Sequence, residues 1–170
     1  MTSPLMFMNV DAPVFITFEM EERPAEECVG GWAEAGLAVR AVRGNKMRTE
    51  AAMYSEFAAA LQFPWYFGEN RDAFFDCLTD LSWLPPGAGY VVVVVGAHEL
   101  LVDSSPDVHR WFAECLEEAR AFWSEPADQG EPWERSAVSF HVVLQHSGRH
   151  GDDVASRWTQ AGASLRHFAT

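Results

Sequence analysis

The run Tyr90-Val-Val-Val-Val-Val95 limits the choice of folds more than any other segment of this 170-residue chain. A strand with one face in water alternates apolar and polar residues, whereas this run is apolar throughout. Its β-branched residues favour extended backbone. The run therefore predicts a strand covered on both faces, as in a parallel sheet. Three further segments predict strands, at residues 14–18, 37–42 and 137–144.

Segments with helical periodicity alternate with these strands. Thr49 is a suitable N-cap for a helix that runs to about Leu61, and Ser105 and Pro106 suit the start of a longer helix. The longer helix carries an apolar stripe that predicts a core-facing side: Val108, Trp111, Phe112, Cys115, Leu116, Ala119, Phe122 and Trp123. Residues 19–27 are expected to form an acidic loop. This order predicts an α/β fold with a mainly parallel sheet.

The charge balance restricts the class of partner. The chain has 12 Lys and Arg against 25 Asp and Glu, a net charge of -13. Phosphate contacts need clustered basic residues, so nucleic acid is not an expected partner. An acidic protein attracts basic partners and speeds encounters with them. The simpler interpretation is that the acidity serves solubility alone.

The number of cysteines and the length of the apolar segments predict where in the cell the protein is found. The three cysteines, Cys28, Cys77 and Cys115, are odd in number and have no paired spacing. We therefore expect free thiols in a reducing compartment. The N-terminal residues lack the basic and apolar regions of a signal peptide, and the run at 90–95 is too short to span a bilayer. A cytoplasmic protein without membrane contact is expected.

The most distinctive motif is Pro64-Trp-Tyr-Phe-Gly-Glu-Asn-Arg-Asp-Ala-Phe-Phe-Asp-Cys-Leu-Thr79. It predicts an aromatic loop followed by a helix over residues 70–81, with Asn70 as its N-cap. At about 100° per residue the helix has an apolar and an acidic face, formed respectively by Phe74, Cys77, Leu78 and Leu81 and by Asp72, Asp76 and Thr79. The helix dipole alone can explain Asp72, and solvation alone can explain Asp76. Together with the aromatics they predict a surface for a cationic partner.

The motif resembles that of the barstar-like family, which includes the intracellular inhibitor of the ribonuclease barnase. The shared pattern is Pro-x-aromatic-aromatic-Gly-Glu-Asn-x-Asp-Ala-x-aromatic-Asp-x-Leu-Thr, and this chain matches every motif position. The resemblance implies a single domain with a barstar-like core at 37–145, a small three-stranded parallel sheet packed with helices. Residues 1–36 would form an N-terminal extension whose extra strand lies at a sheet edge. Residues 146–170 would form a C-terminal extension.

The resemblance also implies an inhibitor with no catalytic activity, cofactor or metal. Its acidic helix would occlude the active site of a basic, secreted, guanyl-specific microbial ribonuclease in a 1:1 complex with a monomer. Asp76 would be the central mimic of RNA phosphate, and Asp72 would pair with a second cation. The full set of implied partner-binding residues is Tyr66, Gly68, Asn70, Asp72, Phe75, Asp76, Thr79, Asp80 and Trp83.

Two residues depart from the family pattern. Phe75 replaces a tryptophan and so lacks the indole N–H donor. Arg71 stands where an apolar residue is usual, and a cation facing a basic nuclease would repel it. The family's further acidic contact on the later helix has no clear counterpart, and we expect Arg110 or Glu114 near that place.

Three alternatives remain open from sequence. One is an immunity protein of the same fold against a nuclease toxin, and another is a regulatory protein that binds no nuclease. The third is a small metal-dependent hydrolase that uses His146, His150 and Asp152, because these are metal-ligand types. Gly148 and Gly151 disfavour a helix that would bring both imidazoles to one side. A mobile polar tail that is dispensable for inhibition is therefore the expected form of the segment from His146 onward.

Overall fold

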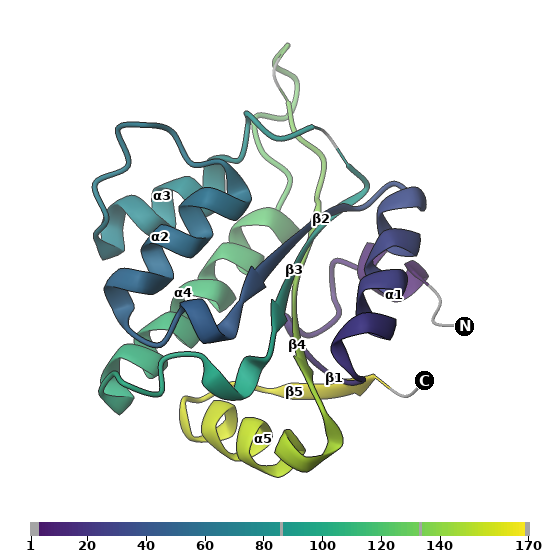
Figure 1. The fold of residues 1–170 in the computed structure, drawn as a ribbon. Coiled ribbons are helices and arrows are strands. Elements are labelled where there is room, and N and C mark those ends of the chain that lie inside the picture. The colour runs from purple at the N-terminus through teal and green to yellow at the C-terminus, as the bar shows by residue number, and fades with distance from the viewer. Residues whose placement is uncertain (1–3, 86, 133, 169–170) are drawn as a thin grey trace.

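The computed structural model describes residues 4–85, 87–132 and 134–168. Its centre is a five-stranded parallel sheet in the order β2-β3-β4-β1-β5 (Figure 1). The strands are β1 (Phe15–Glu19), β2 (Ala38–Arg43), β3 (Gly89–Val95), β4 (Ser139–His146) and β5 (Leu165–Phe168). The predicted α/β class and parallel sheet are confirmed. The prediction of a three-stranded sheet is wrong, because strands from both extensions join it.

Helices cover both faces of the sheet (Figure 1). One face carries α2 (Glu50–Leu61), α3 (Arg71–Asp80), α4 (Pro106–Ser124) and, at one end, α5 (Gly151–Gln160). The other carries α1 (Glu22–Glu34) and the 3₁₀ helix η1 (Pro4–Met8). Three 3₁₀ turns lie in connections: η2 (Gly44–Lys46), η3 (Ala97–Glu99) and η4 (Gly148–His150). None of the helices described is both long and apolar enough to cross a membrane.

The valine run of β3 faces two separate cores. Val92 and Val94 pack into the apolar core beneath α2, α3 and α4, whereas Val91 and Val93 pack into the core beneath α1. Successive residues of a strand point to opposite faces, so the alternating valines of β3 enter both cores and no position of the run needs to be polar. The sequence-based interpretation of this run is therefore confirmed.

The N-terminal extension completes the second face of the sheet. β1 pairs with β4 on one side and β5 on the other, so the expectation that it lies at a sheet edge is wrong. The indole of Trp32 in α1 lies 4.6 Å from the ring of Phe7 and 5.7 Å from the ring of Phe18. These aromatic contacts give the described part of the N-terminal extension, residues 4–36, a structural role that the sequence did not reveal.

The expectation of an acidic loop at residues 19–27 is wrong, because α1 begins at Glu22. Pro24 is tolerated there since the first turn of a helix leaves its N–H groups unpaired. Gly30 and Gly31 weaken intrinsic helix propensity. Burial of Trp32 against the sheet outweighs that penalty.

The expectation of a mobile tail after His146 is also wrong. His146 is the buried last residue of β4, and α5 and β5 follow it. The indole of Trp158 is buried and lies 4.7 Å from the ring of Phe15. β5 pairs with β1, so the two extensions depend on each other.

The predicted starts of two helices are confirmed. The Thr49 hydroxyl accepts a hydrogen bond from the backbone N–H of Ala52 at 3.3 Å, and α4 begins at Pro106. The apolar stripe of α4 faces the core except at Phe122, which is 43% exposed. The guanidinium of Arg135 lies 5.0 Å from the Phe122 ring and covers part of it.

We expect a chain that ends at Gln145 to lose cooperative folding, because it lacks β5 and the buried face of α5. In the full chain, Trp158→Ala should lower the free energy of unfolding by about 3–5 kcal/mol, the usual cost of truncating a buried aromatic residue. Urea denaturation measures both effects. Trp65→Ala is the matched control, because Trp65 is 95% exposed and its loss should change stability by less than about 0.5 kcal/mol. Equal stability of the two variants would contradict a structural role for the C-terminal extension.

Candidate protein-binding site

The helix predicted from the acidic motif is present as α3. The Asn70 carboxamide oxygen accepts a hydrogen bond from the Ala73 N–H at 3.0 Å, which caps the helix as expected. The carboxamide nitrogen donates to the Gly68 carbonyl at 3.2 Å. A Cβ at Gly68 would lie 2.9 Å from that nitrogen, so glycine allows this closed turn. Gly68 and Asn70 thus shape the loop that precedes the acidic face.

Aromatic packing fixes the apolar face of α3 on its neighbours. The Phe74 ring is buried 5.2 Å from Phe57 of α2 and 6.1 Å from Phe112 of α4. The Trp123 indole N–H donates to the Leu78 carbonyl at 2.8 Å, in a buried position. These contacts hold α3 against α4 and leave its acidic face outward.

A groove runs between α3 and α4. From α3 it is lined by Arg71, Asp72, Phe75 and Asp76, and from α4 by Trp111, Glu114, Cys115 and Glu118. The four carboxylates are all exposed. Within the described residues, no ion pair engages any of them. The groove therefore presents four free negative charges from two helices.

The sequence left the acidic contribution of α4 undecided between Arg110 and Glu114. The structure places Glu114 in the groove, whereas the Arg110 guanidinium pairs with the Asp107 carboxylate at 3.0 Å. Glu118 was missed. Its spacing of four residues from Glu114 puts both on one helix face, and this spacing was the available signal.

Arg71 does not present an unpaired cation to the groove. Its Nε lies 2.9 Å from Glu50 Oε1, and its guanidinium carbon lies 4.5 Å from the centre of the Trp111 ring. The Arg71 guanidinium holds the pKa of Glu50 below its usual value, with help from the Tyr54 hydroxyl and against the effect of burial. The expected repulsion of a basic partner is therefore reduced by an internal ion pair.

Two aromatic side chains project from the loop before α3. Trp65 is 95% exposed and Tyr66 is 69% exposed, with their ring centres 5.9 Å apart. Phe67 turns inward instead, toward Phe63 and Tyr54. Tyr66 was predicted as a contact residue and Trp65 was not. The signal for Trp65 was a large aromatic residue in a turn that begins at Pro64.

Three of the predicted residues lie at the other end of α3, outside the lining of the groove. The Thr79 hydroxyl donates to the Phe75 carbonyl at 2.9 Å, and the Asp80 carboxylate accepts from the Ser82 N–H at 3.3 Å. The half-buried Trp83 donates its indole N–H to the Leu61 carbonyl at 2.8 Å. Of the predicted set, the groove brings together Asp72, Phe75 and Asp76.

Cys77 and Cys115 are free thiols, as expected, and the Cys28 thiol donates to the Met20 sulfur at 3.9 Å. Cys115 lies at the base of the groove, where burial and then Glu118 raise the pKa of its thiol to about 12. Burial, with Asp76 and Asp80, also raises the pKa of Cys77. Thiols with raised pKa values are poor nucleophiles at neutral pH.

The histidines of the proposed metal site have other contacts. The His150 ring stacks on His98 at a centre-to-centre distance of 3.7 Å, and His146 is buried. In the part of the chain that the structure describes, no three His, Cys, Asp or Glu side chains are placed to hold a metal ion. Geometry therefore gives no support to the hydrolase alternative.

Residues 37–145 match the family model described as Barstar (barnase inhibitor). The chain belongs to the Barstar family. The match covers β2, α2, α3, β3, α4 and nearly all of β4, so it includes both helices of the groove. No curated protein matches the chain significantly.

Two solved structures match this chain at low sequence identity. A chain from Drosophila ORC bound to AT-rich DNA and Cdc6 has a TM-score of 0.50 at 10% identity, over 96% of this chain and 50% of that one. Cdc6p from Pyrobaculum aerophilum has a TM-score of 0.49 at 13% identity, over 92% of this chain and 38% of that one. This chain thus spans half or less of these two chains. The match to the Drosophila ORC chain shows a similar fold and nothing about function.

We expect Glu50→Gln to lower the free energy of unfolding at pH 7 by up to about 1 kcal/mol, the range for a partly exposed ion pair. The pKa of Glu50 is lowered in the folded protein. Its contribution is therefore present above the pKa of the unfolded state and lost as pH falls through the folded-state value. Urea denaturation at pH 7 and pH 3 should show a difference between wild type and variant that shrinks at pH 3. Glu114→Gln removes the same charge without an ion pair and should show no such loss. A pH-independent difference would contradict the assignment.

Proposed function

We propose that this protein inhibits a microbial guanyl-specific ribonuclease by inserting α3 into its active-site cleft. Membership of the Barstar family supports an inhibitor that has no catalytic activity of its own. The observation that carries the proposal is the groove in which Asp72 and Asp76 of α3 face Glu114 and Glu118 of α4. We further propose that it acts in the cytoplasm as a monomer, binds a basic, secreted nuclease in a 1:1 complex and uses no cofactor.

The groove suits a cleft that normally binds RNA phosphate. Such a cleft gathers cationic side chains, and carboxylates can occupy the positions of phosphate groups. Asp72 and Asp76 are one helical turn apart, where like charges repel by a few tenths of a kcal/mol. A cationic partner relieves this repulsion on binding. Asp76 is assigned the central position because it is exposed. The helix dipole alone would explain an acidic residue in the first turn of α3, but Asp76 lies beyond that turn.

Aromatic residues supply the apolar part of the proposed interface. Trp65 and Tyr66 are exposed beside the acidic helix, and Phe75 forms part of the groove wall. Tryptophan and tyrosine are frequent among the residues that dominate interface energy. We assign Trp65 and Tyr66 to the rim that excludes water from the charged contacts. Gly68 and Asn70 hold the loop, and Thr79, Asp80 and Trp83 would extend the contact past the end of α3.

We expect Asp76→Ala to weaken inhibition of a cognate ribonuclease at least about tenfold, or about 1.4 kcal/mol. The reason is that a cationic group of the nuclease would be left in a desolvated cleft without its counter-charge. Inhibition constants can be measured against a panel of guanyl-specific ribonucleases. Because Asp76 is exposed, the free energy of unfolding should change little.

The matched control for this variant is Asp152→Ala, which removes an exposed aspartate from α5, outside the groove. It should inhibit as wild type does. Equal inhibition by wild type and Asp76→Ala would refute the phosphate-mimic assignment. Failure of the wild-type protein to inhibit any nuclease in the panel would refute the proposed function itself.

Association with the nuclease should slow by about tenfold or more as salt rises. The cause is the net charge of -13, acting over a screening length that falls from about 10 Å at 0.1 M salt to about 3 Å at 1 M. Stopped-flow measurement of the association rate at several salt concentrations tests this. A rate that does not vary with salt would show that the acidity serves solubility alone.

A further inference from the structure

A second cavity, of about 290 Å³, has a lining that differs in charge from that of the acidic groove. It is enclosed by the loop before α4, the first turns of α4 and the last turn of α5. Its polar lining residues are Ser104, Ser105, His109, Arg110, Arg157 and Gln160. Its described lining contains two arginines and no Asp or Glu, in a chain with a net charge of -13.

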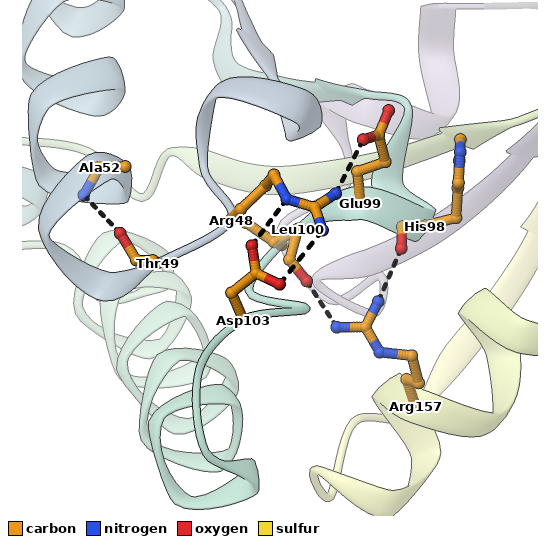
Figure 2. A network of polar contacts seen from close by, with 8 residues as sticks. All are labelled: Arg48, Thr49, Ala52, His98, Glu99, Leu100, Asp103 and Arg157. Atoms are coloured by element: carbon orange, nitrogen blue, oxygen red, sulfur yellow. Dashed lines mark hydrogen bonds and ion pairs between the residues drawn. The ribbon is translucent and has the colours of Figure 1, made fainter.

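Arg157 is a half-buried cation with no carboxylate in contact. Its guanidinium donates to the His98 carbonyl at 2.9 Å and to the Leu100 carbonyl (Figure 2). Among the described residues, no acidic group lies within ion-pair distance of it. Burial lowers its pKa, and the charge of Asp153 opposes this only in part. A charge removed from water without a counter-ion is costly, and an anion in the cavity would offset that cost.

His109 adds no charge to the cavity at neutral pH. Its side chain forms part of the cavity wall and is 6% exposed, and its Nε2 is buried with no hydrogen-bond partner. Burial, and then Arg157, lower its pKa to about 4, so the imidazole is neutral at pH 7. The ring lies edge-on to the Trp158 indole, with 4.8 Å between ring centres, and the buried Nε2 has almost no accessible surface to offer a ligand. The two arginines are therefore the charged groups of the cavity.

The N-terminal end of α4 adds further groups that favour an anion in this cavity. This helix has 19 residues, and its N-cap Ser105 makes no side-chain capping bond. The helix dipole favours an anion at this end, whereas Pro106 has no N–H and the Val108 N–H already donates to the Ser105 carbonyl at 3.1 Å. The hydroxyls of Ser104 and Ser105 lie in the wall of the same cavity. Arg110 follows on α4 and remains 53% exposed despite its pairing with Asp107.

We propose that this cavity binds a phosphate group, held by Arg157, Arg110 and the hydroxyls of Ser104 and Ser105 at the N-terminal end of α4. Phosphate suits the donor set better than a carboxylate does, because its oxygens accept from several directions at once. The volume exceeds that of several water molecules, at about 30 Å³ each, so a hydrated phosphate or a phosphate monoester fits. The site shares no lining residue with the acidic groove and does not depend on the proposed inhibition.

The test is a titration of the full chain with inorganic phosphate at pH 7, against sodium chloride at matched ionic strength. The readouts are calorimetry and the backbone amide NMR signals of Val108 and His109. We expect saturable binding with shifts at these amides. Arg157→Gln should weaken binding about tenfold and Arg110→Gln about threefold, because each removes a charge-assisted contact. Arg110 is exposed and pairs only within its helix, so this second variant keeps the test valid if Arg157→Gln does not fold.

Arg166→Gln is the matched control, because Arg166 is an exposed arginine of β5 outside the cavity lining. It should bind phosphate as wild type does, and so should Asp76→Ala. A parallel titration with adenosine 5′-monophosphate separates the two sources of the phosphate group. If the monophosphate binds more tightly than inorganic phosphate, the ligand of the cavity is a nucleotide. If it binds more weakly, the ligand is the free phosphate ion. The proposal is overturned if phosphate acts no differently from chloride. It is equally overturned if Arg110→Gln and every folded Arg157 variant bind as tightly as wild type.

Discussion

The central strands of this parallel sheet are buried on both faces, and the rest of the structure depends on the helices that cover each face. β4 is buried at every position, because β3 and β1 flank it and helices lie above and below. The Barstar family match, residues 37–145, supplies the helices of one face. The N-terminal extension supplies α1 and η1 for the other. Strand β5 then pairs with β1 and brings α5 against the first core.

The acidic groove follows from how strongly α3 is held. Phe74 contacts rings on both α2 and α4, and the Trp123 indole N–H binds the Leu78 carbonyl. With one face fixed by these contacts, the opposite face and its carboxylates must point to solvent. The groove therefore concentrates repulsion that the fold itself does not relieve, because the arginine in its lining, Arg71, is paired with Glu50 of α2. Such an arrangement is better suited to binding a cation than to stabilising the protein.

Helix α4 serves two surfaces of opposite charge. Its middle contributes Glu114 and Glu118 to the acidic groove, while its start forms the cavity that contains Arg110 and His109. The helix dipole favours anions at the start of the helix, so the separation agrees with the backbone as well as with the side chains. Arg157 reaches this cavity from α5, which lies outside the family match. The C-terminal extension thus adds a feature that the family core does not contain.

Local patterns were sufficient wherever one segment determines its own structure. The valine run of β3, the Thr49 and Asn70 caps and the two faces of α3 could all be predicted, because each depends on neighbours within a turn or on the alternation of a strand. The motif of residues 64–79 also identified the family, since its positions are specific in type and spacing. Helix α1 could not be predicted, because Gly30 and Gly31 disfavour a helix and the burial of Trp32 that offsets them depends on the rest of the fold.

The sequence by itself determined the parallel α/β class, the acidic helix and the family. Only the tertiary structure decided that β1 lies inside the sheet, that α5 and β5 dock on the domain, that Glu118 joins the groove and that Arg71 is paired with Glu50. Each of these depends on groups that are distant in sequence and come together on folding, from Phe15 and Trp158 to Asp76 and Glu118. Periodicity reports which face of an element is apolar, but it does not report which other element covers that face.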